Sequence, residues 1–259
     1  MAVVTIISDW NKNDYYLAAV KGRILSSCPE TTLVDITHQV SPFNSAQAAF
    51  VLRNCFRSYP EGTIHLICVN TESSSEKPHV LIRASKHYFI GCDNGIFGLL
   101  LDEDPEEVII LKKDADHPGS FSELYVFADC ACHIMHKKKL QELGTPAKTV
   151  SKQIPMLPTI DDSTINGSVV YIDSFRNAIT NISRELFDQI RKGRPFDIFV
   201  QSNYYKISRI NNKYSDSSTG EMLALFNSLG LLEIAINSGN AADLLNLSVN
   251  SVLRIKFYD

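Results

Sequence analysis

The chain carries a carboxylate near its start, at a position that could bind a sugar. Asp9 follows the apolar run VVTIIS, residues 3–8, where open α/β sheets place their ligand crevice. Its carboxylate can accept two hydroxyl donors at once, as a ribose diol requires. A helix N-cap or a loop aspartate is the alternative interpretation of this residue.

A second segment, YIDSFRNAITNI at residues 171–182, combines three kinds of recognition group. Asp173 offers a carboxylate, Phe175 an aromatic face and Asn177 an amide. Alternation along an extended segment would place these side chains on one face. Such a set could bind an ammonium group, stack on a base and read the edge of that base. A polar strand face at a barrel edge is the alternative.

The segment CDNGIFG is typical of a tight turn, because Asp93, Asn94 and Gly95 are residue types that turns favour. Neither GxGxxG nor GxxxxGK[ST] follows the first apolar run. The sequence therefore gives no support to a dinucleotide-binding or P-loop site.

The segment CACHIMH contains four side chains that could ligate a soft metal: Cys130, Cys132, His133 and His136. Their spacing matches no standard zinc signature. Small residues on an apolar helix are usually core residues, so we expect no metal here.

The composition indicates an ordinary folded, soluble protein, with 44% hydrophobic and 21% charged residues among 259. The net charge of -4 is spread along the chain, so we expect no nucleic-acid partner. The apolar start AVVTII lacks the features of a signal peptide, and no run is long enough to span a bilayer, so we expect no membrane partner. Six scattered cysteines favour free thiols in a reducing cytoplasm.

The elements that must position these residues alternate in the first half of the chain. Strand-like runs (VVTIIS, TLVDIT, TIHLICV) alternate with stretches of helical spacing (DYYLAAVKGRIL, SAQAAFVLRNCF). HVLIRAS and HYFIGC predict a hairpin, EEVIIL a further strand and ELYVFADCACHIMHKK a helix. We therefore predict an α/β N-terminal domain, residues 1–147, with a mixed sheet and flanking helices.

The second half of the chain has a different pattern. A polar stretch with Pro146, Pro155 and Pro158 predicts a linker at residues 148–163. Short strands separated by turn residues then predict an all-β, barrel-like C-terminal domain at residues 164–259. One helix, SRELFDQIRK, is expected within it, with Ser183 as its N-cap.

The order of these segments resembles that of the S-adenosylmethionine hydroxide adenosyltransferase family, which includes S-adenosylmethionine-dependent chlorinases and fluorinases. The family's TDFG and YVAAMKGVI correspond here to ISDWN and YYLAAVKGRIL, and its IVDITHEIPPFD to LVDITHQVSPFN. Its GPDNGL appears as GCDNGI, VIYIDRFGNLITNI as VVYIDSFRNAITNI, and GLLEIAVNxGNAA as GLLEIAINSGNAA. The correspondence runs in one register along nearly the whole chain.

The resemblance implies an α/β domain, a β-barrel domain and a homotrimer. Its ligand sites would lie between one subunit's N-terminal domain and its neighbour's C-terminal domain. S-adenosylmethionine or adenosine would be the ligand, and no cofactor would be needed. By position, Asp9 would hold the ribose hydroxyls, and Phe43 would form a wall of the nucleoside pocket.

Four residues of the C-terminal domain would recognise the rest of the ligand, by the same resemblance. Asp173 would meet the methionine ammonium, and Ser228 would bind the methionine carboxylate. Phe175 and Asn177 would contact adenine.

The residues that activate water in this family are substituted here. The family uses an aspartate and an arginine in a VDPGVGxxRR-like loop and a histidine in a TFHGRDxFAP-like segment, which together orient and deprotonate water. The corresponding segments read VNTESSSEKP and SFSELYVFAD, with Asn70 at the aspartate, Lys77 at the arginine, Ser122 at the histidine and Glu123 after it. An amide is no base, a hydroxyl does not replace an imidazole, and an ammonium lacks the planar fork of arginine.

Three functions stay open on the sequence alone. An enzyme could displace methionine at C5′ with water, giving adenosine and L-methionine, if Glu72, Glu123 or Lys77 takes over water activation. A non-catalytic protein could bind S-adenosylmethionine or adenosine. A halogenase is the third interpretation: Ser122 would suit a halide pocket, whereas a carboxylate such as Glu123 would repel an anion.

Overall fold

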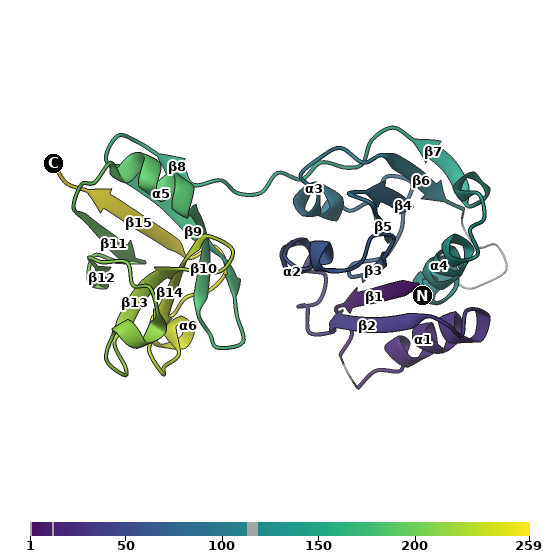
Figure 1. Cartoon of the computed structure of the whole chain (residues 1–259), viewed down its shortest axis with the longest axis horizontal. Helices are drawn as coiled ribbons and strands as arrows, with labels where there is room; N and C mark the ends of the chain where they lie inside the picture. Colours follow the sequence, from purple (N-terminus) through teal and green to yellow (C-terminus); the bar gives the residue numbers. More distant parts are fainter. Residues whose placement is uncertain (1, 12, 113–118) are drawn as a thin grey trace. The chain divides into compact units, whose positions relative to one another are not determined.

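A computed structural model of the chain describes residues 2–11, 13–112 and 119–259, and Figure 1 traces it from end to end. The chain divides into two compact units, residues 1–154 and 155–259. Each unit encloses its own cluster of buried apolar side chains. Each is therefore described by itself.

A seven-stranded sheet forms the centre of the N-terminal unit, in the order β2-β1-β3-β5-β4-β6-β7. Strands β1, β2, β3 and β5 run parallel, and β4, β6 and β7 join them as antiparallel neighbours. This confirms the predicted mixed sheet. The strands are β1 (Val3–Ser8), β2 (Thr32–Thr37), β3 (Ile64–Cys68), β4 (His79–Ala84), β5 (His87–Cys92), β6 (Glu107–Leu111) and β7 (Gly144–Ala147).

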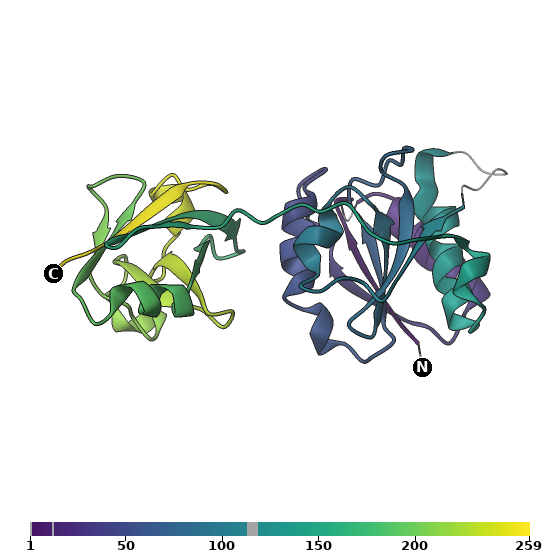
Figure 2. The same ribbon diagram turned by 90° about the horizontal axis from the view of Figure 1, so that it is seen from above.

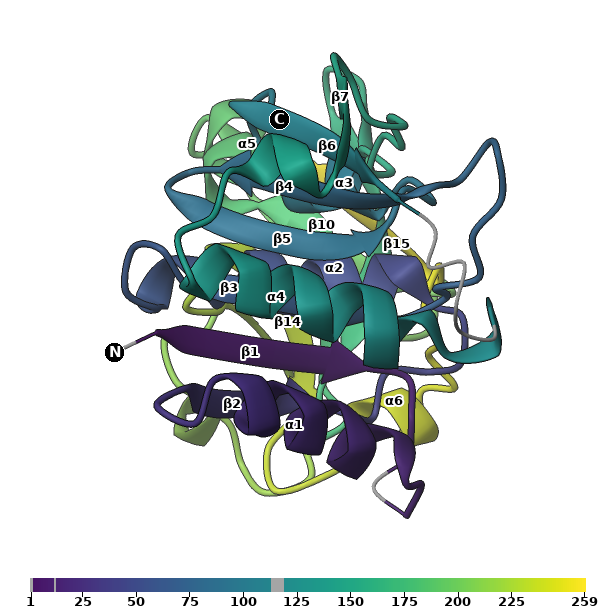
Figure 3. The ribbon, with the colours of Figure 1, turned by 90° about the vertical axis from the view of Figure 1, so that its right-hand side faces the viewer.

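Helices cover both faces of this sheet, which explains why every residue of strand β3 is buried. Helices α1 (Tyr16–Ser27) and α4 (Ala128–Met135) bury Val20, Ile24 and Ala131 on one face. Helices α2 (Ser45–Arg53) and α3 (Ile96–Leu100) cover the opposite face. Figure 2 shows the sheet edge-on between the two layers, and Figure 3 looks onto the face with α1 and α4.

Two local predictions for this unit can be compared with the structure. The predicted hairpin is confirmed: β4 pairs antiparallel with β5, and Ser85 and Lys86 at the turn have φ values of 49° and 63°. The predicted helix over ELYVFADCACHIMHKK begins instead as a π-helical turn, Glu123–Phe127, before α4. Short 3₁₀ helices complete the unit at Phe56–Ser58, Gly119–Phe121 and Leu140–Glu142.

The C-terminal unit is an antiparallel, nearly closed barrel, which confirms the predicted fold class. Its eight-stranded sheet has the order β12-β11-β15-β9-β10-β14-β13, with β8 paired to β9. An isolated bridge between Asn211 and Leu225 links the segment after β12 to β13, at the other end of the strand order. The strands are β8 (Thr159–Ile160), β9 (Thr164–Ile172), β10 (Ala178–Ser183), β11 (Phe196–Val200), β12 (Lys206–Ile207), β13 (Met222–Phe226), β14 (Leu231–Ile236) and β15 (Val252–Phe257).

Two α-helices pack against the barrel, α5 (Arg184–Arg191) and α6 (Ala241–Leu244), and a 3₁₀ helix spans Tyr214–Asp216. The predicted N-cap of α5 is confirmed, since the Ser183 hydroxyl oxygen accepts a hydrogen bond from the Leu186 amide at 3.2 Å. Phe187 of α5 is 1% exposed in the core. The β9–β10 and β13–β14 connections of this barrel carry polar side chains.

Candidate functional site

The Asp9 carboxylate lies where the sequence predicts a ligand crevice, just beyond the carboxyl end of β1. Because β1 and β3 are parallel neighbours, Asp9 and Asn70 follow them at the same edge of the sheet. Asp9 Oδ2 accepts a hydrogen bond from the Phe43 amide at 2.9 Å and a longer one from the Asn70 amide at 3.4 Å. The amides of two predicted site residues, Phe43 and Asn70, thus lie against the carboxylate of a third, Asp9.

Both residues that donate to Asp9 have a left-handed backbone, with φ of 63° at Phe43 and 50° at Asn70. This conformation is uncommon for a bulky residue such as phenylalanine, and such outliers cluster at functional sites. The Phe43 ring is 74% exposed. The backbone of Phe43 is therefore fixed by Asp9, while its aromatic face stays available to a ligand.

The CDNG segment is a turn, as predicted, and it also supports this edge. Asn94 donates from Nδ2 to the Asn70 carbonyl at 2.8 Å, and its Oδ1 accepts from the Ile96 amide. Gly95 has a φ of 94°. Sequence reasoning treated Asn94 as a turn residue only, because its partner lies 24 positions away.

The end of β1 has a further buried support from β2. Ser8 Oγ lies 2.7 Å from His38 Nδ1, and His38 Nε2 lies 3.2 Å from Asp35 Oδ1. This serine is fully buried and its histidine is 4% exposed. The three groups therefore tie the strand that carries Asp9 to its neighbour and do not form a nucleophilic site.

The two segments that depart from the family pattern meet in the structure. Thr71 donates its hydroxyl hydrogen to Oε1 of Glu123, and the Thr71 carbonyl oxygen lies 2.7 Å from His79 Nε2. Glu123 is 5% exposed. Burial raises the pKa of its carboxyl, the Thr71 hydrogen bond opposes that shift, and the charge of Asp9 adds to it.

An aromatic cluster stands beside these carboxylates and consists of Trp10, Tyr15, Tyr16 and Phe121. The Tyr16 and Phe121 rings are 5.0 Å apart in an edge-to-face arrangement, and Trp10 lies 5.8 Å from each. The pKa of Tyr16 is raised, chiefly by Tyr15, with smaller contributions from Asp14 and Glu123. The sequence showed no signal for this cluster beyond the aromatic residues themselves.

The other predicted water-activating positions differ in their surroundings. Lys77 is exposed, and its backbone closes a turn with Ser74 through hydrogen bonds of 3.0 and 3.1 Å. Glu72 is exposed as well. Ser122 is half-buried and immediately precedes the π-helical turn that begins at Glu123.

In the C-terminal unit, the Asp173–Asn177 loop joins β9 to β10 and closes on itself. The Asn177 amide donates to Asp173 Oδ1 at 2.8 Å, and Asn177 Nδ2 donates to Oδ2 at 3.2 Å. The prediction that alternation places Asp173, Phe175 and Asn177 on one face is wrong, because Arg176 has a φ of 66° and the segment turns. Phe175 is 76% exposed, whereas Asn177 is 6% exposed.

Helix α6 anchors this loop from the other side. Arg176 Nη2 forms an ion pair with Asp243 Oδ1, and the Arg176 carbonyl accepts a hydrogen bond from the Ala242 amide at 2.8 Å. Asn240 caps α6 by accepting from the Asp243 amide at 3.0 Å. The loop therefore presents Phe175 from a fixed backbone.

Ser228 lies in the turn between β13 and β14 and is exposed. The neighbouring Asn227 donates to Oε2 of the buried Glu233 at 3.1 Å, and Tyr214 donates to Oε1 at 2.7 Å. Burial and the Glu233 charge raise the pKa of Tyr214, and Asp173 adds to that shift. Glu233 thus fixes the turn that carries Ser228, a role that sequence reasoning missed.

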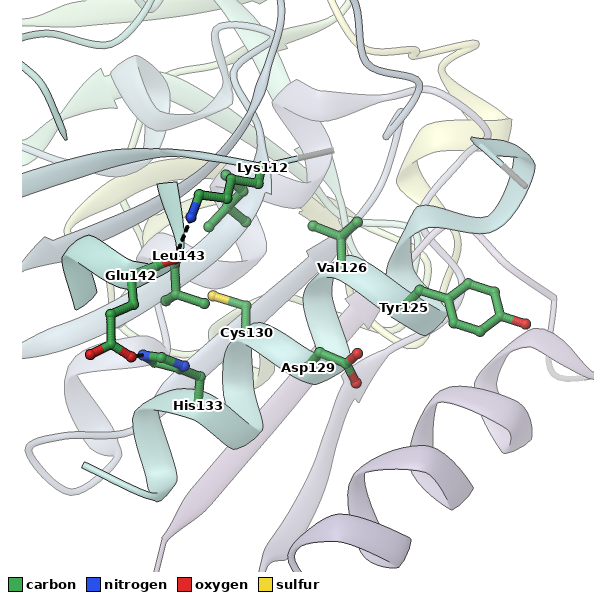
Figure 4. A pocket seen from close by; sticks show the side chains of 9 residues that line it. Lys112, Tyr125, Val126, Asp129, Cys130, His133, Glu142 and Leu143 are labelled. Carbon is green, nitrogen blue, oxygen red and sulfur yellow. Dashed lines mark hydrogen bonds and ion pairs between the residues drawn. The ribbon is translucent and has the colours of Figure 1, made fainter. Parts of the chain in front are cut away.

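A separate pocket of about 280 Å³ lies beside α4, and no residue predicted for the ligand site lines it. Its lining includes His133, whose Nε2 lies 4.0 Å from Glu142 Oε2, and Lys112, which donates to the Glu142 carbonyl (Figure 4). Tyr125 and Asp129 line the same pocket. These interactions connect α4 to the segment before β7.

The CACHIMH segment packs against the C-terminal end of α1. His136 Nε2 lies 3.6 Å from Cys28 Sγ, and the Cys132 thiol interacts with the same sulfur. Burial is the main cause that raises the pKa of Cys132 to about 12. Within the described ranges, no group of three or more His, Cys, Asp and Glu side chains is arranged to hold a metal ion. Nor does any helix in those ranges have the length and apolarity that a membrane crossing requires.

Comparison with known proteins gives matches over both units. The family model for the SAM hydroxide adenosyltransferase N-terminal domain matches residues 4–144, and that for the C-terminal domain matches residues 167–254. An (R)-S-adenosyl-L-methionine hydrolase from Thermus thermophilus is 26% identical over 98% of this chain and 100% of its own length. One from Methanocaldococcus jannaschii is 25% identical over 95% of this chain and 92% of its own. A fluorinase from an Actinoplanes species is 21% identical over 98% and 97% of the two chains.

Two solved structures share the arrangement of elements. An uncharacterized conserved protein from Thermotoga maritima has a TM-score of 0.87 at 24% identity, covering 99% of this chain and 100% of the other. A conserved hypothetical protein from Thermus thermophilus has a TM-score of 0.76 at 25% identity, covering 100% of both. The first likeness concerns the fold alone.

Proposed function

Because the chain belongs to the S-adenosylmethionine hydroxide adenosyltransferase family, we propose that it binds S-adenosylmethionine and displaces methionine from C5′ with water. The products are adenosine and L-methionine. The observation that carries this proposal is the Asp9 carboxylate, held at the edge of the sheet by the amides of Phe43 and Asn70. A carboxylate in that position suits the two hydroxyl groups of a ribose.

The C-terminal unit supplies the remaining contacts in this proposal. Asp173, whose carboxylate is fixed by Asn177, meets the methionine ammonium. Phe175 stacks on adenine and Asn177 addresses the base edge. Ser228, on the turn held by Glu233, binds the methionine carboxylate.

We further propose a homotrimer in which each site combines the N-terminal unit of one subunit with the C-terminal unit of another. Two phenyl rings assigned to the proposed ligand site support it, Phe43 at 74% and Phe175 at 76% exposure. Such exposed rings leave aromatic surface that a ligand and a neighbouring subunit can bury. All six cysteines are free thiols, which supports a location in the cytoplasm.

The reaction needs little acid catalysis for departure, because the sulfonium leaves as a neutral thioether. Alignment of the water, C5′ and the sulfur is therefore the main requirement. A halide nucleophile is disfavoured, since the buried carboxylate of Glu123 would repel an anion near the substituted segments.

Incubation of the purified protein with S-adenosylmethionine tests the activity. We expect adenosine and methionine to accumulate in equal amounts, measured by liquid chromatography against a protein-free blank. No turnover above the blank would contradict the proposal. Formation of a 5′-halogenated nucleoside only when chloride or fluoride is added would show that the nucleophile is the halide and not water.

A non-catalytic binder is the second candidate, and the exposed position of Lys77 favours it. In that case calorimetry would detect binding of S-adenosylmethionine or adenosine while the chromatographic assay stays at the blank. Absence of binding for both compounds would eliminate this candidate.

A further inference from the structure

We infer that Glu123 is the general base that receives the proton of the attacking water, in place of the family's substituted groups. This inference rests on the proposed hydrolysis of S-adenosylmethionine. It assigns a catalytic role to a residue at which the family pattern has glycine. It also separates the three replacements, Glu72, Lys77 and Glu123, that the sequence leaves open.

Glu123 lies in one of the two altered segments and contacts the other. Glu123 begins a π-helical turn that directly precedes α4, and such turns are rare and frequently lie at functional sites. Its Oε1 accepts the hydroxyl hydrogen of Thr71, in the loop that also carries Asn70. The substitutions in the two segments therefore create one new contact, since the family pattern has proline at the position of Thr71.

Glu123 is 5% exposed, whereas Glu72 and Lys77 both lie exposed on the loop after β3. A buried carboxylate is costly unless it is hydrogen-bonded, and a hydroxyl donor from Thr71 offsets part of that cost. A structural role alone would be served equally well by a neutral residue, such as glutamine, that can also accept this hydrogen bond.

Burial and the nearby charge of Asp9 raise the pKa of Glu123, which brings the carboxylate closer to the pH at which a base is most effective. Two successive residues connect the two carboxylates, because the Asn70 amide donates to Asp9 and the Thr71 hydroxyl donates to Glu123. Among the described residues, the charge of Glu123 contributes to raising the pKa of Tyr16 of α1, Cys68 of β3 and Cys92 of β5.

The bonds in this step balance without a further reactant. The water oxygen forms a bond to C5′ while the bond between C5′ and sulfur breaks and its electron pair stays on sulfur. One water hydrogen passes to the carboxylate of Glu123 as a proton. The products are adenosine and neutral-thioether methionine, and Glu123 later returns its proton to solvent. Thr71 acts as a positioning residue that holds the carboxylate.

The substitution Glu123→Gln tests this role. The amide retains the size of the side chain and an oxygen that accepts from Thr71, but it cannot take a proton. We expect kcat to fall by about 100-fold or more, while the dissociation constant for S-adenosylmethionine, measured by calorimetry, stays within about threefold. The matched control is Glu72→Gln, at the exposed residue that follows Thr71. We expect this variant to leave kcat unchanged.

A second variant keeps the inference testable if Glu123→Gln does not fold. Thr71→Val removes the hydrogen bond that favours the ionised carboxylate, so the acid limb of the kcat profile should move to higher pH, and Thr71→Ser should restore it. Wild-type turnover that persists in Glu123→Gln, or a profile that Thr71→Val leaves in place, would overturn the base assignment alone. Binding without any wild-type turnover would instead overturn the proposed hydrolysis together with this inference.

Discussion

Two carboxylates that we assign to the same ligand are held in opposite ways. Asp173 is fixed by Asn177, four residues further along its own loop. Asp9 accepts hydrogen bonds from residues 34 and 61 positions away. The first arrangement forms wherever the β9–β10 hairpin forms, whereas the second requires the edge of the sheet to be assembled.

This difference explains which region tolerates new residues. The Asp173 carboxylate is fixed within its own loop, whose backbone α6 also anchors through Arg176, and YIDSFRNAITNI keeps the family pattern nearly intact. At the carboxyl end of β3 the site is built from segments that are distant in the sequence. A substitution in one of these segments can be compensated by a substitution in another. Thr71 and Glu123, 52 residues apart, form such a pair.

The largest effect on ligand binding should follow removal of the Asp9 carboxylate. We expect Asp9→Ala to lower the affinity for both S-adenosylmethionine and adenosine by about 100-fold, since two bonds to the ribose and the anchor of Phe43 are lost together, a loss of about 3 kcal/mol. Calorimetry with each compound measures it. Asp9→Asn can still accept a hydrogen bond from the Phe43 amide. A loss of affinity in this variant therefore reports the contacts of Asp9 with the ligand and not a loss of the local fold.

The control for this variant is Asp104→Ala, an aspartate whose side chain is 88% exposed and which pairs with Lys152 at 3.5 Å. Its affinity for both compounds should equal that of the wild type. If Asp9→Ala binds either compound within about threefold of the wild type, the assignment of Asp9 to the ribose is wrong.

A smaller and more selective effect should follow Asp173→Asn. Loss of one charge facing the methionine ammonium should weaken S-adenosylmethionine binding by about 10-fold, or about 1.4 kcal/mol. Adenosine has no ammonium group, so its affinity should stay unchanged. An equal loss for both compounds would show that Asp173 acts through the shape of its loop and not through its charge.

The fold could be predicted from the sequence where the pattern was local. The mixed sheet, the β4–β5 hairpin, the barrel and the Ser183 cap all follow from periodicity and turn chemistry within short windows. In the C-terminal half the pattern predicts strands at GSVVYID, FDIFVQS, YYKISRI, GLLEIAIN and VLRIKFYD. Strands β10 and β13 are not among them, and β7 lies in a proline-containing stretch that gives no strand signal. These strands depend on pairing with distant neighbours.

The candidate site was predictable to the same extent. Motif order along the chain identified the family, while the assignment of Asp9 and Asp173 to the ligand stays a prediction. Alternation placed Phe175 and Asn177 on one face, which the Arg176 turn prevents. The sequence could not choose among the three replacement residues, because only packing shows that Glu123 is buried. Contacts across 52 residues leave no periodic trace in the sequence.

The central strands β3 and β5 of the N-terminal sheet offer a control for pH effects, since they carry a buried histidine pair, His65 and His87. His65 Nδ1 lies 2.7 Å from Thr5 Oγ1, and His65 Nε2 lies 3.2 Å from His87 Nδ1. Burial lowers the pKa of His65 to about 3, and His87 adds to the shift. Acid therefore lowers the stability of the N-terminal unit through His65, in addition to any effect on the proposed activity through Glu123.

The smallest effect concerns how strongly His65 makes the stability of the N-terminal unit depend on pH. The folded pKa of about 3 lies below the ordinary value of 6.5, so the unfolded chain binds a proton that the folded chain does not, and stability falls as pH decreases below 6.5. From pH 6 to pH 5 the free energy of unfolding should drop by about 1 kcal/mol more in the wild type than in His65→Phe. Fluorescence of Trp10, the one tryptophan of the chain, reports denaturant unfolding of this unit, and the exposed His136→Gln serves as the control. An equal drop in the wild type and His65→Phe would show that His65 contributes nothing to the acid sensitivity, and the acid limb of kcat could then be assigned to Glu123 without this correction.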